Sequence, residues 1–172
     1  MPDLDSTLIA NREAVNELAV AAERCGTVWT TPRAPGKWSP SQLVEHVARS
    51  LEESANVIAG VPSKLPTLPS FVRPLVRTLI FNRIVRTGSF PFRAKAPKAM
   101  DPASGPATPM EGRRRLEEAL MRFDRECRAC AQRGGVVSNG AFGRISVADY
   151  AQFLAIHTRH HRKQLPAGVA AS

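Results

Sequence analysis

The sequence lacks several features that would identify a protein class at once. None of its apolar runs approaches the roughly 20 residues that a membrane span requires. The N-terminal stretch MPDLDSTLIANREAV lacks the basic and apolar regions of a signal peptide. Three widely spaced cysteines, an odd number, do not form a disulfide framework. We therefore expect a cytoplasmic protein without a membrane span.

Acidic residues are missing from one long segment. Residues 54–100 hold eight Lys or Arg and no Asp or Glu, whereas the whole chain has a net charge of +9. The rest of the chain is therefore nearly neutral, and the excess charge belongs to this segment. The eight cations are Lys64, Arg73, Arg77, Arg83, Arg86, Arg93, Lys95 and Lys98. Because the apolar and charged contents are ordinary for a globular protein, we expect one domain over residues 1–172.

Helical periodicity dominates the remaining sequence, and no segment alternates cleanly as a strand would. We predict long helices over residues 4–25, 40–59, 109–133 and 146–165. The capping sequences SPSQ, from residue 39, and TPME, from residue 108, mark two of the starts. These helices predict an all-α four-helix bundle. A proline-rich insert, about residues 61–107, separates helices two and three, and its centre should form a short helix near Pro74.

The four histidines of the chain fall on two of these helices. His157 and His161 are one turn apart on the apolar face of the last helix, so their imidazoles overlie one spot. His46 lies about one turn after the capped start of the second helix, and a facing helix would bring it to the same place. The alternative, a metal-free core, leaves several buried ring nitrogens in need of partners. We predict that all three histidines bind one divalent ion with open coordination positions.

Two segments resemble a known family. KWSPSQLVEHVARSLE and FGRISVADYAQFLAIHTRHHRKQL, which contains H-x-x-H-H-x-x-Q, are similar to the DinB/YfiT-like metalloenzymes, especially their DUF1569-type branch. Through the order of the helices, the resemblance extends over nearly the whole chain. It implies an up-down-down-up four-helix bundle in which a histidine of the second helix and an H-x-x-x-H pair bind the metal. The matching positions are His46, His157 and His161.

Three further side chains have alternative interpretations. Gln164 follows His161 by three residues. One interpretation is that it orients a metal ligand or a bound water; the other is that it is a solvated C-terminal residue. His160 lies toward the polar border of its helix. It is either an outer partner of the metal site or an ordinary packing residue. Glu53 lies two turns beyond His46, a spacing that only permits a general base, and no catalytic residue is assigned.

A three-histidine ion lowers the pKa of bound water or stabilises a thiolate. The resemblance implies metal-dependent hydrolysis, or transfer and isomerisation reactions with a low-molecular-weight thiol. We therefore expect an enzyme that uses Zn or Ni, acts on a small molecule and forms a homodimer, with no specific nucleic-acid partner. The insert would be a lid or pocket wall in which Arg77 and Arg83 attract an anionic substrate. Two alternatives remain. In the first, the insert is solvated and has no functional role. In the second, the protein is a non-catalytic binding protein with a structural metal, and its basic insert contacts nucleic acid or an anionic membrane.

Overall fold

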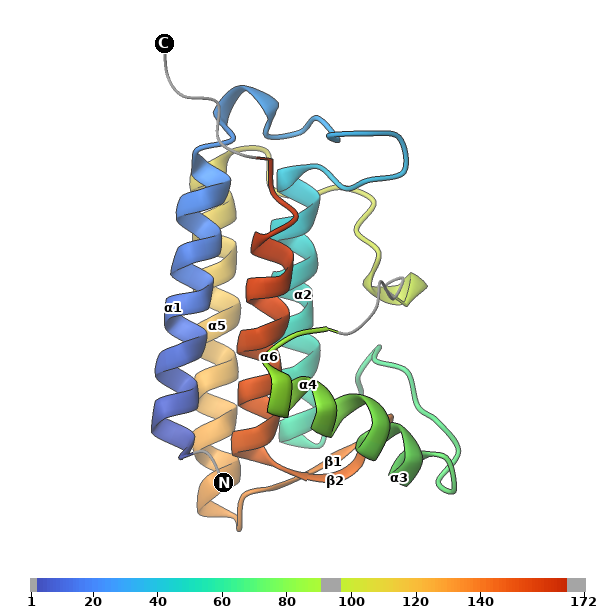
Figure 1. Cartoon of the computed structure of the whole chain (residues 1–172). Coiled ribbons are helices and arrows are strands. Elements are labelled where there is room, and N and C mark those ends of the chain that lie inside the picture. Colours follow the sequence, from blue (N-terminus) through green and yellow to red (C-terminus); the bar gives the residue numbers. More distant parts are fainter. Residues whose placement is uncertain (1–2, 91–96, 167–172) are drawn as a thin grey trace.

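Four long helices lie side by side in the computed structural model, which describes residues 3–90 and 97–166 (Figure 1). The long helices are α1 (Leu4–Glu23), α2 (Pro40–Ala59), α5 (Pro109–Gln132) and α6 (Val147–Arg162). Helices α1 and α6 run in one direction and pack along each other, while α2 and α5 run in the opposite direction and form the second pair. The predominantly helical prediction is confirmed. None of the described helices is long and apolar enough to cross a membrane.

The predicted helix starts are confirmed in atomic detail. Ser39 accepts a hydrogen bond from the backbone N–H of Gln42, whose side chain accepts one from the Ser39 N–H in return. Thr108 and Glu111 form the same reciprocal cap at the start of α5. These bonds satisfy backbone donors that have no partner inside the helix. Helix α2 ends at Gly60, whose positive φ of 73° is the left-handed conformation that glycine adopts readily.

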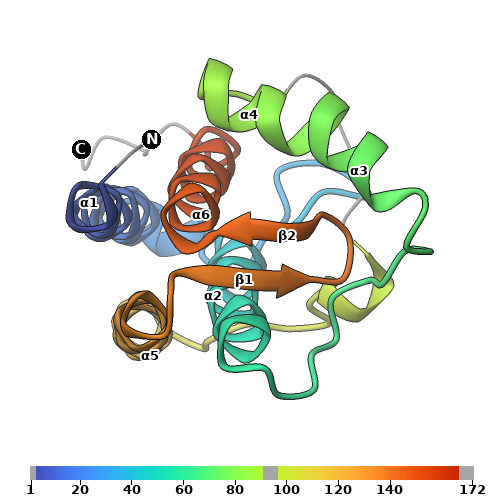
Figure 2. The same cartoon turned by 90° about the horizontal axis from the view of Figure 1, so that it is seen from below.

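A short antiparallel hairpin contradicts the expectation that the chain has no strand. Strands β1 (Val136–Asn139) and β2 (Gly143–Ser146) connect α5 to α6 across one end of the helices (Figure 2). Val137 and Ile145 pair directly and are buried against the core. Each strand has only four residues, so its alternation is too short to stand out against helical periodicity.

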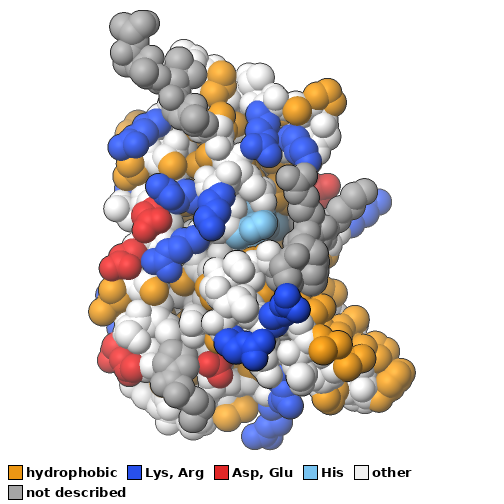
Figure 3. Space-filling view, in the orientation of Figure 1, with side chains coloured by type: hydrophobic (Ala, Val, Ile, Leu, Met, Phe, Trp, Pro, Cys, Tyr) orange, Lys and Arg blue, Asp and Glu red, His pale blue; other side chains and the backbone are white. Residues whose placement is uncertain are grey.

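The middle of the insert forms a helical segment that starts at the predicted place. It comprises α3 (Arg73–Val76), a π-helical turn η2 (Arg77–Phe81) and α4 (Asn82–Thr87). This segment lies across α6 and the hairpin (Figure 2), with Phe81 and Ile84 buried. Phe71, Leu75 and Leu79 of the insert are exposed. Figure 3 shows hydrophobic side chains gathered at its lower right, on the side where α3 lies in Figure 1.

The second half of the insert is tied to the start of α2. The backbone carbonyl of Pro106 accepts hydrogen bonds from the Ser41 hydroxyl, at 2.7 Å, and from the Trp29 indole, at 2.8 Å. Gly105 packs so closely that a Cβ added there would lie 2.2 Å from the Ser41 carbonyl oxygen. A short 3-10 turn, η3 (Lys98–Met100), precedes these contacts. This anchoring holds Met100 beside α2. Another 3-10 turn of three residues, η1 (Gly26–Val28), follows α1.

Candidate metal centre

The three predicted ligands lie together in the folded chain. His46 comes from α2, and His157 and His161 come from adjacent turns of α6. One ring nitrogen of each histidine lies within 4.8 Å of the corresponding nitrogens of the other two. His46 and His161 are buried, and His157 is partly exposed. Figure 3 shows a histidine side chain at the surface, with Lys and Arg side chains nearby.

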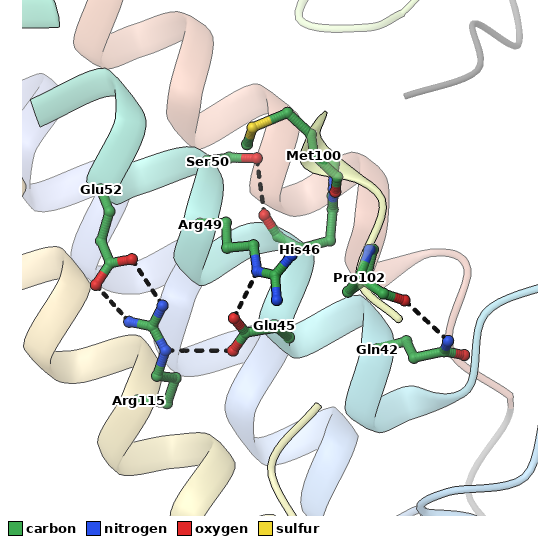
Figure 4. Close-up of polar contacts among 9 residues, drawn as sticks. All are labelled: Gln42, Glu45, His46, Arg49, Ser50, Glu52, Met100, Pro102 and Arg115. Atoms are coloured by element: carbon green, nitrogen blue, oxygen red, sulfur yellow. Dashed lines mark hydrogen bonds and ion pairs between the residues drawn. The ribbon is translucent and has the colours of Figure 1, made fainter. Parts of the chain in front are cut away.

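The ring of His46 is oriented by the insert. Its Nδ1 atom lies 2.9 Å from the Met100 carbonyl oxygen (Figure 4 shows both residues). Because a carbonyl oxygen only accepts hydrogen bonds, Nδ1 must carry the proton, and Nε2 keeps its lone pair for a metal. Histidine ligands are commonly fixed in this way by a hydrogen bond from the other ring nitrogen.

Gln164 gives His161 a comparable partner. Its Oε1 atom lies 3.3 Å from His161 Nδ1, and its Nε2 atom lies 2.9 Å from His160 Nε2. With Nδ1 of His161 donating to the amide oxygen, Nε2 of that ring keeps its lone pair, which faces His157 Nε2 at 3.1 Å. The structure thus favours the orienting role for Gln164, and it connects His160 to the site through the same amide. The His160 ring also packs 5.0 Å from that of Phe90, measured between centroids.

Burial keeps the three candidate ligands in the neutral form that binds metals. It lowers the pKa of His161 to about 3, and His46 and His160 add to the effect. Burial and the neighbouring histidines lower the pKa of His157 well below its ordinary value. Burial also lowers the pKa of His46, although the hydrogen bond to Met100 opposes the shift. All three rings are therefore neutral at neutral pH, with one ring nitrogen protonated and a lone pair on the other.

The donor set and its spacing fit a single transition-metal ion. Two imidazole nitrogens bound to one tetrahedral ion at about 2.0–2.1 Å lie about 3.3–3.4 Å apart. His157 Nε2 and His161 Nε2 are 3.1 Å apart, and small ring movements would bring His46 to the same ion. Among the residues that the structure describes, the group consists of these three donors. Three histidines suit zinc, nickel, copper or iron and leave coordination positions open.

A cavity of about 430 Å³ opens beside the histidines. The insert contributes Ile80, Ile84 and Phe90 to its wall, Phe142 comes from the turn of the hairpin, and Phe153 comes from α6. Apolar side chains therefore form most of the described lining. The volume matches that of cavities that bind small molecules.

The DUF1569 family, described as a protein of unknown function, matches residues 5–167. The chain belongs to this family. A search of curated proteins and a search of solved structures find no significant match.

An ion-pair network supports the segment of α2 that carries His46 in this DUF1569 protein. Arg115 of α5 binds both carboxylate oxygens of Glu52, at 2.6 and 2.7 Å, and reaches Glu45 at 3.2 Å (Figure 4). The hydrogen bonds to Glu52 raise the pKa of Arg115, and Glu45 adds to the effect. The side chain of Arg49 pairs with Glu45 in turn. This network joins α5 to the turn of α2 that contains His46.

The structure does not bring the two predicted substrate-binding arginines to the cavity. Arg77 donates a hydrogen bond to the Arg144 carbonyl oxygen at 2.9 Å, so it joins the insert to the hairpin. Arg83 is exposed, and neither residue is part of the described lining. Two other cations of the insert, Arg93 and Lys95, lie outside the described residues.

Glu53 anchors the beginning of the insert. Its carboxylate accepts hydrogen bonds from the Lys64 N–H at 2.7 Å and the Ser63 hydroxyl at 3.0 Å. Burial raises the pKa of Glu53, but these hydrogen bonds outweigh burial and hold the pKa below its ordinary value. Because Glu53 is absent from the described lining of the cavity, its position does not support a general base.

Several cavity residues were not predicted from the sequence. Trp38 packs its ring 4.6 Å from that of His46, and the polar residues Ser54, Asn139 and Tyr150 also line the cavity. Ser54 and Tyr150 lie at two-turn spacing from predicted ligands on the same helices, so helical periodicity could have found them. Nothing in the sequence marks the backbone carbonyl that orients His46.

Proposed function

We propose that this DUF1569 protein is a metal-dependent enzyme of the DinB/YfiT-like type, which acts on a small molecule as a hydrolase or as a thiol-dependent transferase or isomerase. The observation that carries the proposal is the convergence of His46, His157 and His161 beside a cavity of small-molecule size. The helix directions, with α1 and α6 opposed to α2 and α5, agree with the up-down-down-up order that the resemblance implies.

The residues of the chain supply binding, orientation and shelter from water. The three neutral imidazoles would hold a zinc or nickel ion, with His46 and His161 fixed by the Met100 carbonyl and by Gln164. Such an ion supplies Lewis-acid activation of a water molecule or a thiol. The apolar wall excludes bulk solvent from the reacting groups and thereby strengthens their electrostatic interactions.

A purely structural metal is less well supported. Structural zinc sites normally have a closed set of four protein donors. In the described part of the chain, the group has three donors, and it borders a cavity rather than a packed core. This difference favours a catalytic role over the binding-protein alternative.

Metal analysis of variants tests the proposal. Protein purified without metal-affinity resin should contain about one equivalent of a transition metal, because a site with three imidazole donors binds such ions tightly. His157→Ala or His161→Ala should abolish the metal content, whereas His160→Ala should leave it largely intact. Equal loss in all three variants would contradict the ligand assignment. Turnover of candidate substrates by metal-loaded protein, with and without a small thiol, then separates hydrolysis from thiol transfer.

A further inference from the structure

Three polar side chains form a chain of contacts in the cavity. Tyr150, a buried residue of α6, donates a hydrogen bond from its hydroxyl group to Ser54 Oγ of α2 at 2.9 Å. Burial raises the pKa of the same tyrosine, and Asn139, which lies near it, lowers the pKa by a smaller amount. Asn139 is itself held in place, because its Oδ1 accepts the backbone N–H groups of Ala141 and Phe142 at 2.9 and 3.1 Å. The hydrogen bond from Tyr150 therefore orients the Ser54 oxygen, and Asn139 lies beside this pair in the same cavity.

The proton of the Ser54 hydroxyl is the free end of this chain. Ser54 is only 2% exposed and lines the cavity, and its oxygen already accepts the Tyr150 proton. Tyr150 is the hydrogen-bonding partner that the structure gives the Ser54 hydroxyl among residues 3–90 and 97–166. Two hydroxyl groups that share one hydrogen bond use one of their two protons, and with Tyr150 donating the remaining proton is that of Ser54. A buried donor without an acceptor is costly, so this hydroxyl group is expected to bind an acceptor brought by a ligand.

The spacing along the helices gives the distance from Ser54 to the histidines. Ser54 lies eight residues after His46 on α2, and Tyr150 lies seven residues before His157 on α6. Because the two helices run in opposite directions, both intervals lead to the same end of the cavity. At 1.5 Å per residue they place the free hydroxyl group about 11 Å from the histidines.

The described part of the lining between these two ends is uncharged. Of the described residues that line the cavity, none is Asp, Glu, Lys or Arg. A charged group in this region would lose its hydration without gaining an ionic partner, which is strongly unfavourable. The ligand body should therefore be neutral and mainly apolar, and only its end at the histidines is suited to an anionic group.

We propose that the cavity binds an elongated substrate with a neutral, mainly apolar body, whose reactive end lies at the three histidines and whose far end carries an oxygen that accepts a hydrogen bond from Ser54. The inference rests on the proposed function and adds the substrate class to it. Ser54 determines specificity by recognising this oxygen, while Tyr150 and Asn139 position the Ser54 hydroxyl group.

Two metal-binding probes that differ in one oxygen test the inference. Octanohydroxamate binds a metal through its hydroxamate and fills the cavity with an alkyl chain, and 7-oxo-octanohydroxamate adds a carbonyl near the far end. Calorimetry on the metal-loaded protein should show roughly threefold to tenfold tighter binding of the oxo probe, as one neutral hydrogen bond provides. Ser54→Ala should abolish this preference while changing the affinity for octanohydroxamate less than about twofold.

Two further variants make the test specific. Ser50→Ala is the matched control: Ser50 lines the same cavity, but its hydroxyl donates to the His46 carbonyl oxygen at 2.8 Å, so the preference should persist. Tyr150→Phe keeps the aromatic packing and removes the donor to Ser54, so it should weaken the preference even if Ser54→Ala fails to fold.

The outcomes distinguish this inference from the proposed function. Probes that perturb the visible absorption of the cobalt-loaded protein, yet bind equally well with or without the oxygen, would overturn the role of Ser54 alone. A preference that survives Ser54→Ala would do the same. Tighter binding of a probe with a carboxylate at its far end would overturn the neutral substrate class. Protein that binds no metal would instead overturn the proposed function, and this inference with it.

Discussion

Replacing Gln164 tests how strongly the outer partners of the histidines control metal binding. Gln164→Met keeps an unbranched side chain of similar length but removes both hydrogen bonds, to His161 at 3.3 Å and to His160 at 2.9 Å. His161 Nδ1 then loses the acceptor that fixes its tautomer. Loss of such a partner typically reduces metal affinity about 10- to 100-fold. The bond to His161 is long, so we expect the lower end, about tenfold, which corresponds to about 1.4 kcal/mol.

Competition for zinc between the protein and a chromophoric chelator measures this affinity directly. The matched control is His160→Ala, which removes the other partner of the Gln164 amide but leaves the bond to His161. We expect the control to lose less than about threefold in affinity, because the tautomer of His161 remains fixed. Circular dichroism of both variants should match the wild type.

Wild-type affinity in Gln164→Met would refute the reasoning, because packing alone would then suffice to orient His161. A loss of equal size in Gln164→Met and His160→Ala would also refute it. In that case the effect would come through His160 rather than through the His161 tautomer.

Three further results are expected. Gly105→Ala should reduce the free energy of unfolding by about 1–3 kcal/mol and the Tm by about 2–12 °C, because the new Cβ would lie 2.2 Å from a backbone oxygen. The control is Gly26→Ala, whose Cβ would have no neighbouring atom within 4 Å, and its Tm should be nearly that of the wild type. In urea unfolding, Arg115→Met should cost about 1–2 kcal/mol, because two carboxylates of α2 lose a partner that is 26% exposed. Arg114→Met removes a longer pair at a residue 75% exposed and should cost less than about 0.5 kcal/mol. Chelation of the metal should lower the Tm by several degrees and preserve the helical circular dichroism, whereas complete unfolding would favour a structural metal.

Local signals account for the parts of the fold and site that the sequence predicted. The caps at Ser39 and Thr108 depend on residues three positions apart, so they can be recognised without tertiary information. The pair formed by His157 and His161 follows from the four-residue repeat of a helix. His46 required one more inference, that its helix faces the last one, and the structure brings these three rings together.

Tertiary contacts account for what the sequence did not predict. The hairpin consists of two four-residue strands, and only pairing between them makes Val137 and Ile145 recognisable as a buried pair. In the insert, an ideal helix would place Arg77 on the same face as Ile80 and Ile84. The π-helical turn over residues 77–81 breaks that regularity, and the isoleucines line the cavity while Arg77 contacts the hairpin.

The position of the insert separates two properties that the sequence had combined, its positive charge and its contact with the site. Ile80, Ile84 and Phe90 of the insert form part of the cavity wall. Arg77 instead joins the insert to the hairpin, and Arg83 is exposed. Figure 3 shows Lys and Arg side chains on the surface around a histidine, outside the apolar lining. Charges in that position act on an approaching molecule over roughly 8 Å at physiological salt. They can therefore raise the rate of encounter with an anionic group, while the choice among bound molecules depends on the uncharged wall and on Ser54.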